Sequence, residues 1–325
     1  MREIKWALAM LAVACLGSAP LGSVQAQGYP SKPVRVIITF PPGSTTDILG
    51  RIVTQKLSDL WSQPVVVENR GGAGGSIGSA VVAKAAPDGY VLLINSNAHA
   101  VNPSQYAQLP YDTQKDFTDI APLSSAPNVL VVNPASRIKS LKEFIAEAKA
   151  KPGQINFAHA GSGSGTHLNT EKFKLAAGID FVQVPYKGTQ EVFTDLFGDR
   201  VTCYFAPIAP AIPHVRDGKL RALAVSSAKR AASLPDVPTV AEAGVPGFEF
   251  VLWFGLWGPA GLPSDVVNRI NRDVIRALAA PDVNERLAKL GYDTMNMTPQ
   301  EFGAFVRKEI ADYARIFKAA GIKPQ

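Results

Sequence analysis

The stretch that decides the fold is VRVIITFPPGSTTDIL, at residues 34–49. Its β-branched start reads as a buried strand, and the residues from Asp47 onward have a helical period. Between them lies a turn of proline, glycine and hydroxyl residues. A second stretch, INFAHAGSGSGTHL at residues 155–168, has the same order of strand, turn and helix. The pair predicts two α/β units, each with a turn at a helix N-terminus.

Each turn has the chemistry of an anion site. The first N–H groups of a helix lack internal partners and the helix dipole adds positive charge, so a carboxylate can be held there without Arg or Lys. Hydroxyls able to donate to it belong to Ser44, Thr45, Ser162, Ser164 and Thr166. Two such ends facing each other predict a cleft for an anion. The alternative is that these residues only cap helices, and Asp47 fits a cap as well as a ligand contact.

The rest of the chain alternates short apolar runs with longer helical segments. Strands are predicted at residues 34–38, 65–67, 91–94, 129–132 and 220–225. Helices are predicted at residues 47–60, 141–150, 166–177, 191–198, 264–278 and 299–319. This alternation predicts parallel sheets covered by helices. Nearly 300 residues after the leader are enough for two domains.

The N-terminus has the order of a secretory signal. Arg2 and Lys5 precede an apolar run at residues 6–16, and small residues follow up to Ala26, where cleavage is expected. The alternative is a lipoprotein site at Cys15. Removal of the leader leaves Cys203 as the remaining cysteine and excludes an internal disulfide. No later apolar run reaches the roughly 20 residues of a membrane helix.

Charge and motifs exclude several classes of function. The net charge of +6 favours small anions, but the basic residues are scattered, so nucleic acid is not expected. The sequence has no G-x-x-x-x-G-K-[ST] loop, no G-x-G-x-x-G register and no His or Cys cluster with metal-ligand spacing. We therefore expect no nucleotide or metal cofactor.

An enzyme is the main alternative. Residues 74–78, GGSIG, match the G-x-S-x-G nucleophile motif of α/β-hydrolases, with Ser76 as the nucleophile. Candidate bases are His99, His159, His167 and His214. Against this, a loose glycine-rich loop follows Val67 where the motif requires a sharp strand-to-helix turn. A structural or adhesive role is a third class, but it leaves the paired hydroxyl-rich turns unexplained.

Several motifs resemble those of one known family, the tripartite tricarboxylate transporter substrate-binding proteins, also called the Bug family. In the first half they are FPPGSTTD at 40–47 with Arg51, VENRGGAGGSIG at 67–78 and APDGY at 86–90. In the second half they are GSGSGTHL at 161–168, VPYKG at 184–188 and DVPTVAEAG at 236–244. The resemblance covers essentially the whole mature chain, in the order of the family.

The resemblance implies a type II periplasmic-binding-protein fold, in which two α/β domains are joined by two crossover strands with a ligand cleft between them. The crossings are expected near residues 124–132 and 248–257. They place the first domain at residues 27–126 plus 248–325 and the second at 127–247. The resemblance also implies a monomeric periplasmic protein that binds a small carboxylate and delivers it to a membrane permease with a large and a small subunit.

Carried over residue by residue, the family motifs imply a set of ligand contacts. These are Pro42, Gly43, Ser44, Thr45, Thr46 and Asp47 in the first loop, and Ser162, Gly163, Ser164, Gly165 and Thr166 in the second, with Gly188 and Thr189 closing the pocket and Asn95 to Asn97 at its edge. Ring contacts are expected from Phe205, or from Phe40, Phe193 and Tyr204, although each of these also fits an ordinary core position.

Two departures from the family pattern bear on the ligand. Ser44 stands where the family commonly has a second glycine, which adds a hydroxyl to the first loop. Ala206 and Pro207 stand where members often have an Asp, and the loss of that carboxylate disfavours an amino-bearing ligand. We therefore expect a plain dicarboxylate or an aromatic acid.

Overall fold

The structure is a computed structural model that describes residues 28–319 and 321–324. The predicted signal at residues 1–26, and Cys15 within it, lie outside the described residues. Lys32–Gln325 form one compact unit. Within the described part of the chain, no helix combines the length and apolar character needed to cross a membrane.

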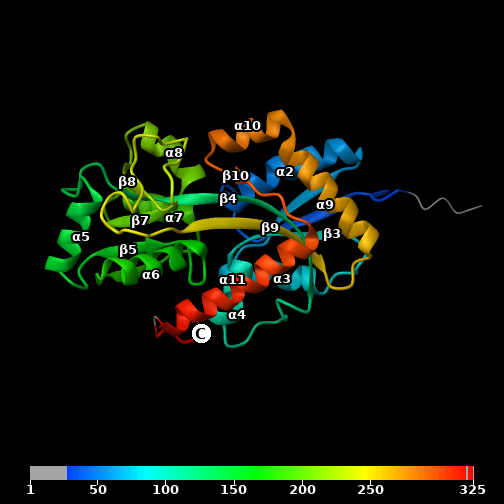
Figure 1. Cartoon of the computed structure of the whole chain (residues 1–325), viewed down its shortest axis with the longest axis horizontal. Coiled ribbons are helices and arrows are strands. Elements are labelled where there is room, and N and C mark those ends of the chain that lie inside the picture. Colours follow the sequence, from blue (N-terminus) through cyan, green and yellow to red (C-terminus); the bar gives the residue numbers. More distant parts are fainter. Residues whose placement is uncertain (1–27, 320, 325) are drawn as a thin grey trace, which may run out of the picture. The chain divides into compact units, whose positions relative to one another are not determined.

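The elements alternate along most of the chain (Figure 1). The strands are β1 (Val34–Ile38), β2 (Val65–Asn69), β3 (Val91–Ser96), β4 (Phe117–Val132), β5 (Asn156–His159), β6 (Val182–Pro185), β7 (Cys203–Pro207), β8 (Arg221–Val225), β9 (Val251–Pro259) and β10 (Asp293–Thr294). The helices are α2 (Thr45–Trp61), η1 (Ala73–Gly75), α3 (Ser76–Ala83), α4 (Ala98–Gln105), α5 (Leu141–Ala150), α6 (Gly165–Ala177), α7 (Thr189–Phe197), α8 (Ile208–Arg216), α9 (Ser264–Ala279), α10 (Pro281–Lys289) and α11 (Pro299–Ala319).

The strands pair in the order β2-β1-β3-β9-β4-β7-β5-β6, and β8 and β10 also pair with β4. β1 runs parallel to β2 and β3, and β5 runs parallel to β6 and β7. These two groups match the predicted parallel sheets. β4 and β9 differ, because they run antiparallel to each other and to the strands beside them. They pass between the two groups as the crossover strands (Figure 1).

We call the part around β1–β3 the first domain and the part around β5–β7 the second domain. Helices α2 and α3 pack on the strands of the first domain, and α9 and α11 pack on the crossover strand β4. Helices α6, α7 and α8 pack on the strands of the second domain. The parallel order within each group brings the C-terminal ends of its strands to one edge, where turns lead into helices. This edge is where open α/β sheets bind ligands.

The predicted strands and helices are all present, and most of their ends are shifted by only a few residues. The exception is β4, which begins at Phe117, whereas the predicted strand covered only residues 129–132. Among the described residues, the α-helices α3, α4, α8 and α10 and the short 3₁₀ helix η1 were not predicted. Both α4 and α8 contain a proline, Pro103 and Pro213 respectively, which removes a helical hydrogen bond. Buried contacts on β3, β4 and β7 stabilise these helices in place of a strong local pattern.

An aromatic cluster fills the second domain. Phe205 lies in its centre and is fully buried. Its ring centroid is 5.5 Å from that of Phe157 and 5.3 Å from that of Phe173, and it stacks on Phe248 at 6.4 Å. Phe205 therefore occupies the ordinary core position that was the alternative to a ring contact. It does not line the cavity described below.

Candidate functional site

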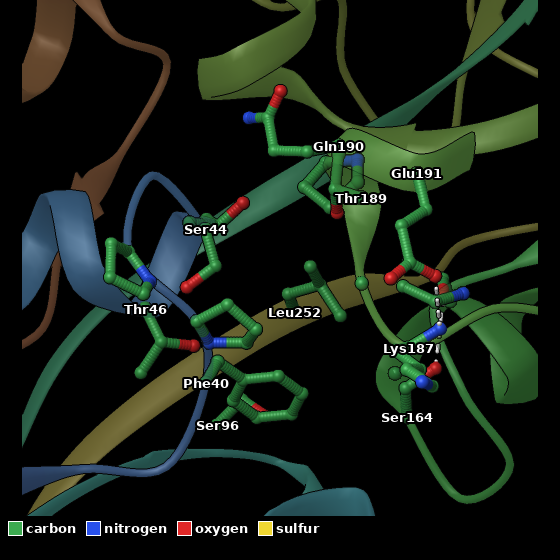
Figure 2. A pocket seen from close by; sticks show the side chains of 18 of the residues that line it. Phe40, Ser44, Thr46, Ser96, Ser164, Lys187, Thr189, Gln190, Glu191 and Leu252 are labelled. Atoms are coloured by element: carbon green, nitrogen blue, oxygen red, sulfur yellow. Dashed lines mark hydrogen bonds between the residues drawn. The ribbon is translucent and has the colours of Figure 1, made fainter. Parts of the chain in front are cut away.

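A cavity of 210 Å³ lies where the turns after β1, β5, β6 and β7 meet. Its lining residues are Phe40, Pro41, Pro42, Ser44, Thr45, Thr46, Ser96, Ala160, Ser164, Gly165, Thr166, Lys187, Gly188, Thr189, Gln190, Glu191, Pro207, Leu252 and Phe254. Figure 2 shows Ser44 and Thr46 on one side of the cavity and Thr189 and Gln190 on the other. We call this space the inner cavity.

The first side of the inner cavity is the N-terminus of α2. Ser44 caps the helix, because its hydroxyl accepts a hydrogen bond from the Asp47 N–H at 3.3 Å. Thr45, which follows it, is only 4% exposed, and its hydroxyl has no hydrogen-bond partner among the described residues. A buried hydroxyl without a partner is costly, so the Thr45 hydroxyl is a donor available to a ligand.

Asp47 belongs to the support of this turn and does not line the inner cavity. Its carboxylate accepts hydrogen bonds from the Gly43 N–H at 2.9 Å and from the Asn69 amide at 2.8 Å. The Arg51 guanidinium donates to it at 2.9 Å. The ion pair with Arg51 offsets the negative charge of Asp47 at the start of α2.

The opposite side includes the N-terminus of α6. Ser164 caps this helix through the His167 N–H at 3.3 Å, and its hydroxyl lies 2.9 Å from that of Thr166. The Thr166 hydroxyl in turn accepts from the Ala160 N–H at 2.9 Å. These bonds hold both hydroxyls at the cavity surface. Gly165 has no room for a side chain, because an added Cβ would lie 2.1 Å from Leu252 Cδ2.

Two more helices begin at the inner cavity. Gly188 precedes α7, and the Thr189 hydroxyl lies 3.0 Å from that of the buried Tyr204. Pro207 precedes α8, which has no acidic residue in its first turn. Sequence reasoning found the start of α7 but not that of α8. The signal for α8 was weak, since Pro207 ends a buried strand and Pro213 interrupts the helical pattern.

The charges at the inner cavity are few. Among its lining residues, only Lys187 and Glu191 are charged, and both are exposed at the rim. The Glu191 carboxylate accepts a hydrogen bond from the Lys187 N–H at 3.1 Å, which ties the turn before α7 to its first helical turn (Figure 2). No acidic residue lies in the first turn of α6 or α8. The helix ends therefore leave a positive field in the cavity.

The cavity contains most of the predicted contacts and several that were not predicted. It brings together Phe40, Pro42, Ser44, Thr45, Thr46, Ser96, Ser164, Gly165, Thr166, Gly188 and Thr189, and it adds Gln190, Leu252 and Phe254. These additions come from β9 and the second residue of α7, which carry no turn motif. The crossover strand expected near residues 248–257 could have suggested that β9 passes the cavity. Which of its side chains face the cavity, however, depends on how β9 pairs with β3 and β4.

The remaining predicted contacts lie elsewhere. Gly43 and Asp47 support the first turn, and Gly163 donates its N–H to His167 Nδ1 at 3.2 Å. Asn95 accepts from the Thr39 hydroxyl at 2.7 Å, and Asn97 donates to the Tyr313 hydroxyl at 3.2 Å. Ser162 lines a neighbouring cavity. The hydrogen bonds of Gly43, Asp47, Asn95, Asn97 and Gly163 hold turns and helices in place around the inner cavity.

The histidines are not arranged as catalytic bases. His99 packs against the rings of Phe117 and Trp257, and burial lowers its pKa to about 3. His159 and His167 stack with centroids 4.5 Å apart, and burial lowers their pKa values to about 3 and about 4. Both ring nitrogens of His99, and Nδ1 of His159 and of His214, have no hydrogen-bond partner among the described residues. No three potential metal ligands cluster in this part of the chain.

Comparison with known proteins identifies the family. Residues 49–322 match the sequence profile of the tripartite tricarboxylate transporter family receptor. The chain belongs to this family. The receptor is therefore a solute-binding protein and not an enzyme, which removes the hydrolase alternative at Ser76.

Relatives and solved structures agree over nearly the full length. The receptor is 37% identical to Protein BugT of Bordetella pertussis, over 97% of this chain and 98% of that protein. It resembles the structure of R. palustris Rpa4515 with adipate, at 34% identity and a TM-score of 0.88, over 91% of this chain and 100% of that one. It also resembles MatC of Rhodopseudomonas palustris with bound malate, at 32% identity and a TM-score of 0.82, over 89% and 99%.

Proposed function

We propose that the receptor binds a small organic carboxylate in the inner cavity, with a dicarboxylate or an aromatic acid favoured. The observation that carries this proposal is the convergence of the N-termini of α2, α6, α7 and α8 on one small cavity. Fixed N–H dipoles stabilise an anion that has left water, and the Thr45 hydroxyl adds a free donor.

The size and chemistry of the cavity support a compact ligand. Its 210 Å³ is below the roughly 300–1,000 Å³ of sites for drug-sized ligands. Leu252, Phe254 and Phe40 supply apolar surface between the polar helix ends. The similar structures contain adipate and malate, which are dicarboxylates of this size range. Pro207 stands at the start of α8, and the exposed Glu191 carboxylate accepts a hydrogen bond at the rim. The ammonium group of an amino acid ligand would therefore find no buried carboxylate partner in the cavity.

The proposal includes the protein's place in transport. The receptor is exported by its N-terminal signal, with cleavage after Ala26, and acts as a monomer in the periplasm. The two domains, residues 27–126 plus 248–325 and residues 127–247, close on the ligand. The closed form delivers it to a membrane permease with a large and a small subunit. Membership in the tripartite transporter family supports this partner.

Two measurements on the purified mature protein test the binding function. A thermal-shift screen of mono-, di- and tricarboxylates, aromatic acids and acidic amino acids should raise the melting temperature with one narrow class, because a ligand that binds the native state stabilises it. A screen in which no carboxylate raises the melting temperature would contradict the proposal.

Thr45→Val tests the site itself. Valine keeps the shape of threonine and removes the free hydroxyl, so the affinity for the carboxylate should fall about tenfold or more, as expected for a hydrogen bond to a charged group. Unliganded stability should hardly change, since the hydroxyl has no partner to lose. Calorimetry measures the affinity. The matched control is Thr54→Val, which is buried on the same helix but away from the cavity. Equal affinities in the two variants would place the ligand elsewhere.

A further inference from the structure

A second, larger cavity adjoins the inner cavity. It measures 540 Å³, and we call it the outer cavity. Both cavities are lined by Phe40, Pro41, Pro42, Ala160 and Lys187, so these residues form their common wall. The outer cavity is lined further by the glycine-rich loop at residues 71–75, which the inner cavity does not use.

The common wall is a contact between separate chain segments. Phe40–Pro42 belong to the turn after β1, whereas Ala160 and Lys187 belong to the turns after β5 and β6. The segments meet where Pro41 Cγ lies 3.5 Å from the position that a Cβ on Gly188 would take. Because the contact joins separate turns, we expect that a ligand longer than the inner cavity can extend past it when these turns move apart.

Several aromatic residues line the outer cavity. Tyr106 and Tyr186 add their rings to that of Phe40 and to the two prolines of the common wall. Gly74 has a φ of +60°, and a Cβ added there would lie 3.0 Å from Asn102 Oδ1 and 3.3 Å from both the Tyr106 hydroxyl and the Ser162 carbonyl oxygen, so this position accommodates no side chain. Lys187 is the one charged lining residue, and no carboxylate lines the cavity. Flat apolar groups suit such a lining, and acidic protein groups do not oppose an anionic ligand.

We propose that the outer cavity is a second subsite that holds an aromatic ring carried by a carboxylate bound in the inner cavity. This inference rests on the proposed function, because the inner cavity must hold the carboxylate. It assigns a role to the glycine-rich loop at residues 71–75, which gives the outer cavity a wall made mainly of backbone.

Two pairs of acids test the subsite by calorimetry on the mature protein. The pairs are succinate with phenylsuccinate, and propanoate with 3-phenylpropanoate, so that each pair differs only in the ring. In at least one pair the phenyl acid should bind about tenfold more tightly or better, because burial of a ring removes a large apolar surface from water. A phenyl acid that binds no better than its unsubstituted partner in both pairs would overturn the subsite.

Variants locate the effect. Tyr106→Ala removes a ring from the wall, and Ser162→Phe fills the outer cavity from the opposite side; each should abolish the advantage of the phenyl acid and leave the affinity for the short acid unchanged. Tyr106→Phe keeps the ring and should keep the advantage. Thr45→Val should weaken both members of a pair. If the phenyl acid still binds more tightly than its unsubstituted partner in both Tyr106→Ala and Ser162→Phe, the proposed subsite is wrong. The proposal that the inner cavity binds a carboxylate would be unaffected. Binding of no acid in any screen would overturn the proposed function as well.

Discussion

At the scale of single residues, burial decides which polar groups remain free to act. Asp47 and Asn95 resemble ligand contacts in the sequence, yet their side chains are committed to neighbouring turns. Thr45 lies next to the capping residue and keeps an unpaired hydroxyl at the inner cavity. Polar groups near a site are therefore of two kinds: those that hold the turns and those that face the cavity. Only their hydrogen-bond partners in the folded protein show which kind each group is.

His99 provides a prediction at this scale. It is fully buried and both ring nitrogens lack a partner among the described residues, so burial lowers its pKa from 6.5 to about 3. Below pH 6.5 the unfolded chain binds a proton at His99 that the folded protein does not bind until about pH 3. The contribution of neutral His99 to the free energy of unfolding is thus fully present above pH 6.5. It is lost as the pH falls from 6.5 toward 3, at about 1.4 kcal/mol per pH unit.

His99→Leu should remove this part of the acid sensitivity. Urea unfolding between pH 7 and pH 4 should show a free energy of unfolding that falls less steeply with acid in the variant than in the wild type. The decline should not vanish, because the pKa values of His159 and His167 are also lowered by burial. Identical slopes in the two proteins would show that His99 is not held neutral by the fold.

At the scale of elements, the site is made of helix starts. Ser44 and Ser164 cap α2 and α6 in the same way, with the side chain accepting the N–H of the residue three positions on. Both have extended backbone, with ψ near 160°. The two strand-turn-helix units are thus alike in local structure, and each presents its first free N–H groups to the inner cavity.

Gly165 sets how closely α6 approaches the rest of the site. A methyl group there would lie 2.1 Å from Leu252 Cδ2 and 2.6 Å from the Asn97 side-chain oxygen, so Gly165→Ala should displace the start of α6. We expect at least a tenfold loss of carboxylate affinity, measured by calorimetry. Gly198→Ala, at the end of α7, is the control, because the added methyl meets chiefly the flexible end of Arg200. Unchanged binding in Gly165→Ala would show that the start of α6 does not contact the ligand.

At the scale of the whole molecule, β4 and β9 connect the two domains and pair along most of their length. The domains also touch across the inner cavity, where the Gln190 amide donates to the Gly43 carbonyl at 3.4 Å. This contact joins the turn after β1 to the start of α7 and involves no strand, so we expect that it can open while the sheet stays paired. We expect from this arrangement that the two domains act as a hinged clamp.

Closure predicts a change in dimensions in solution. Small-angle X-ray scattering of the mature protein should give a larger radius of gyration without ligand than with a saturating carboxylate. Thr45→Val, at a ligand concentration below its own dissociation constant, should keep the larger value. A radius that is the same with and without bound ligand would argue for a rigid cleft.

Local chemistry alone determined much of this protein. Hydrophobic runs predicted β1, β2, β3 and β8, and hydroxyl residues before helical segments predicted the starts of α2 and α6. These signals act over a few residues, through side-chain alternation and capping, so they can be recognised in the sequence without the fold. They also predicted that an anion would be held between two helix ends.

Only the tertiary structure decided which residues meet. It added α8 and the β9 side chains Leu252 and Phe254 to the inner cavity, and it placed Phe205 in the aromatic core. It also committed Asp47 to Arg51 and Asn69. Such outcomes depend on strand order and on contacts between residues far apart in the chain, where burial and packing outweigh local preference. For that reason a turn motif can indicate a helix start, but it cannot show which side chain faces the ligand.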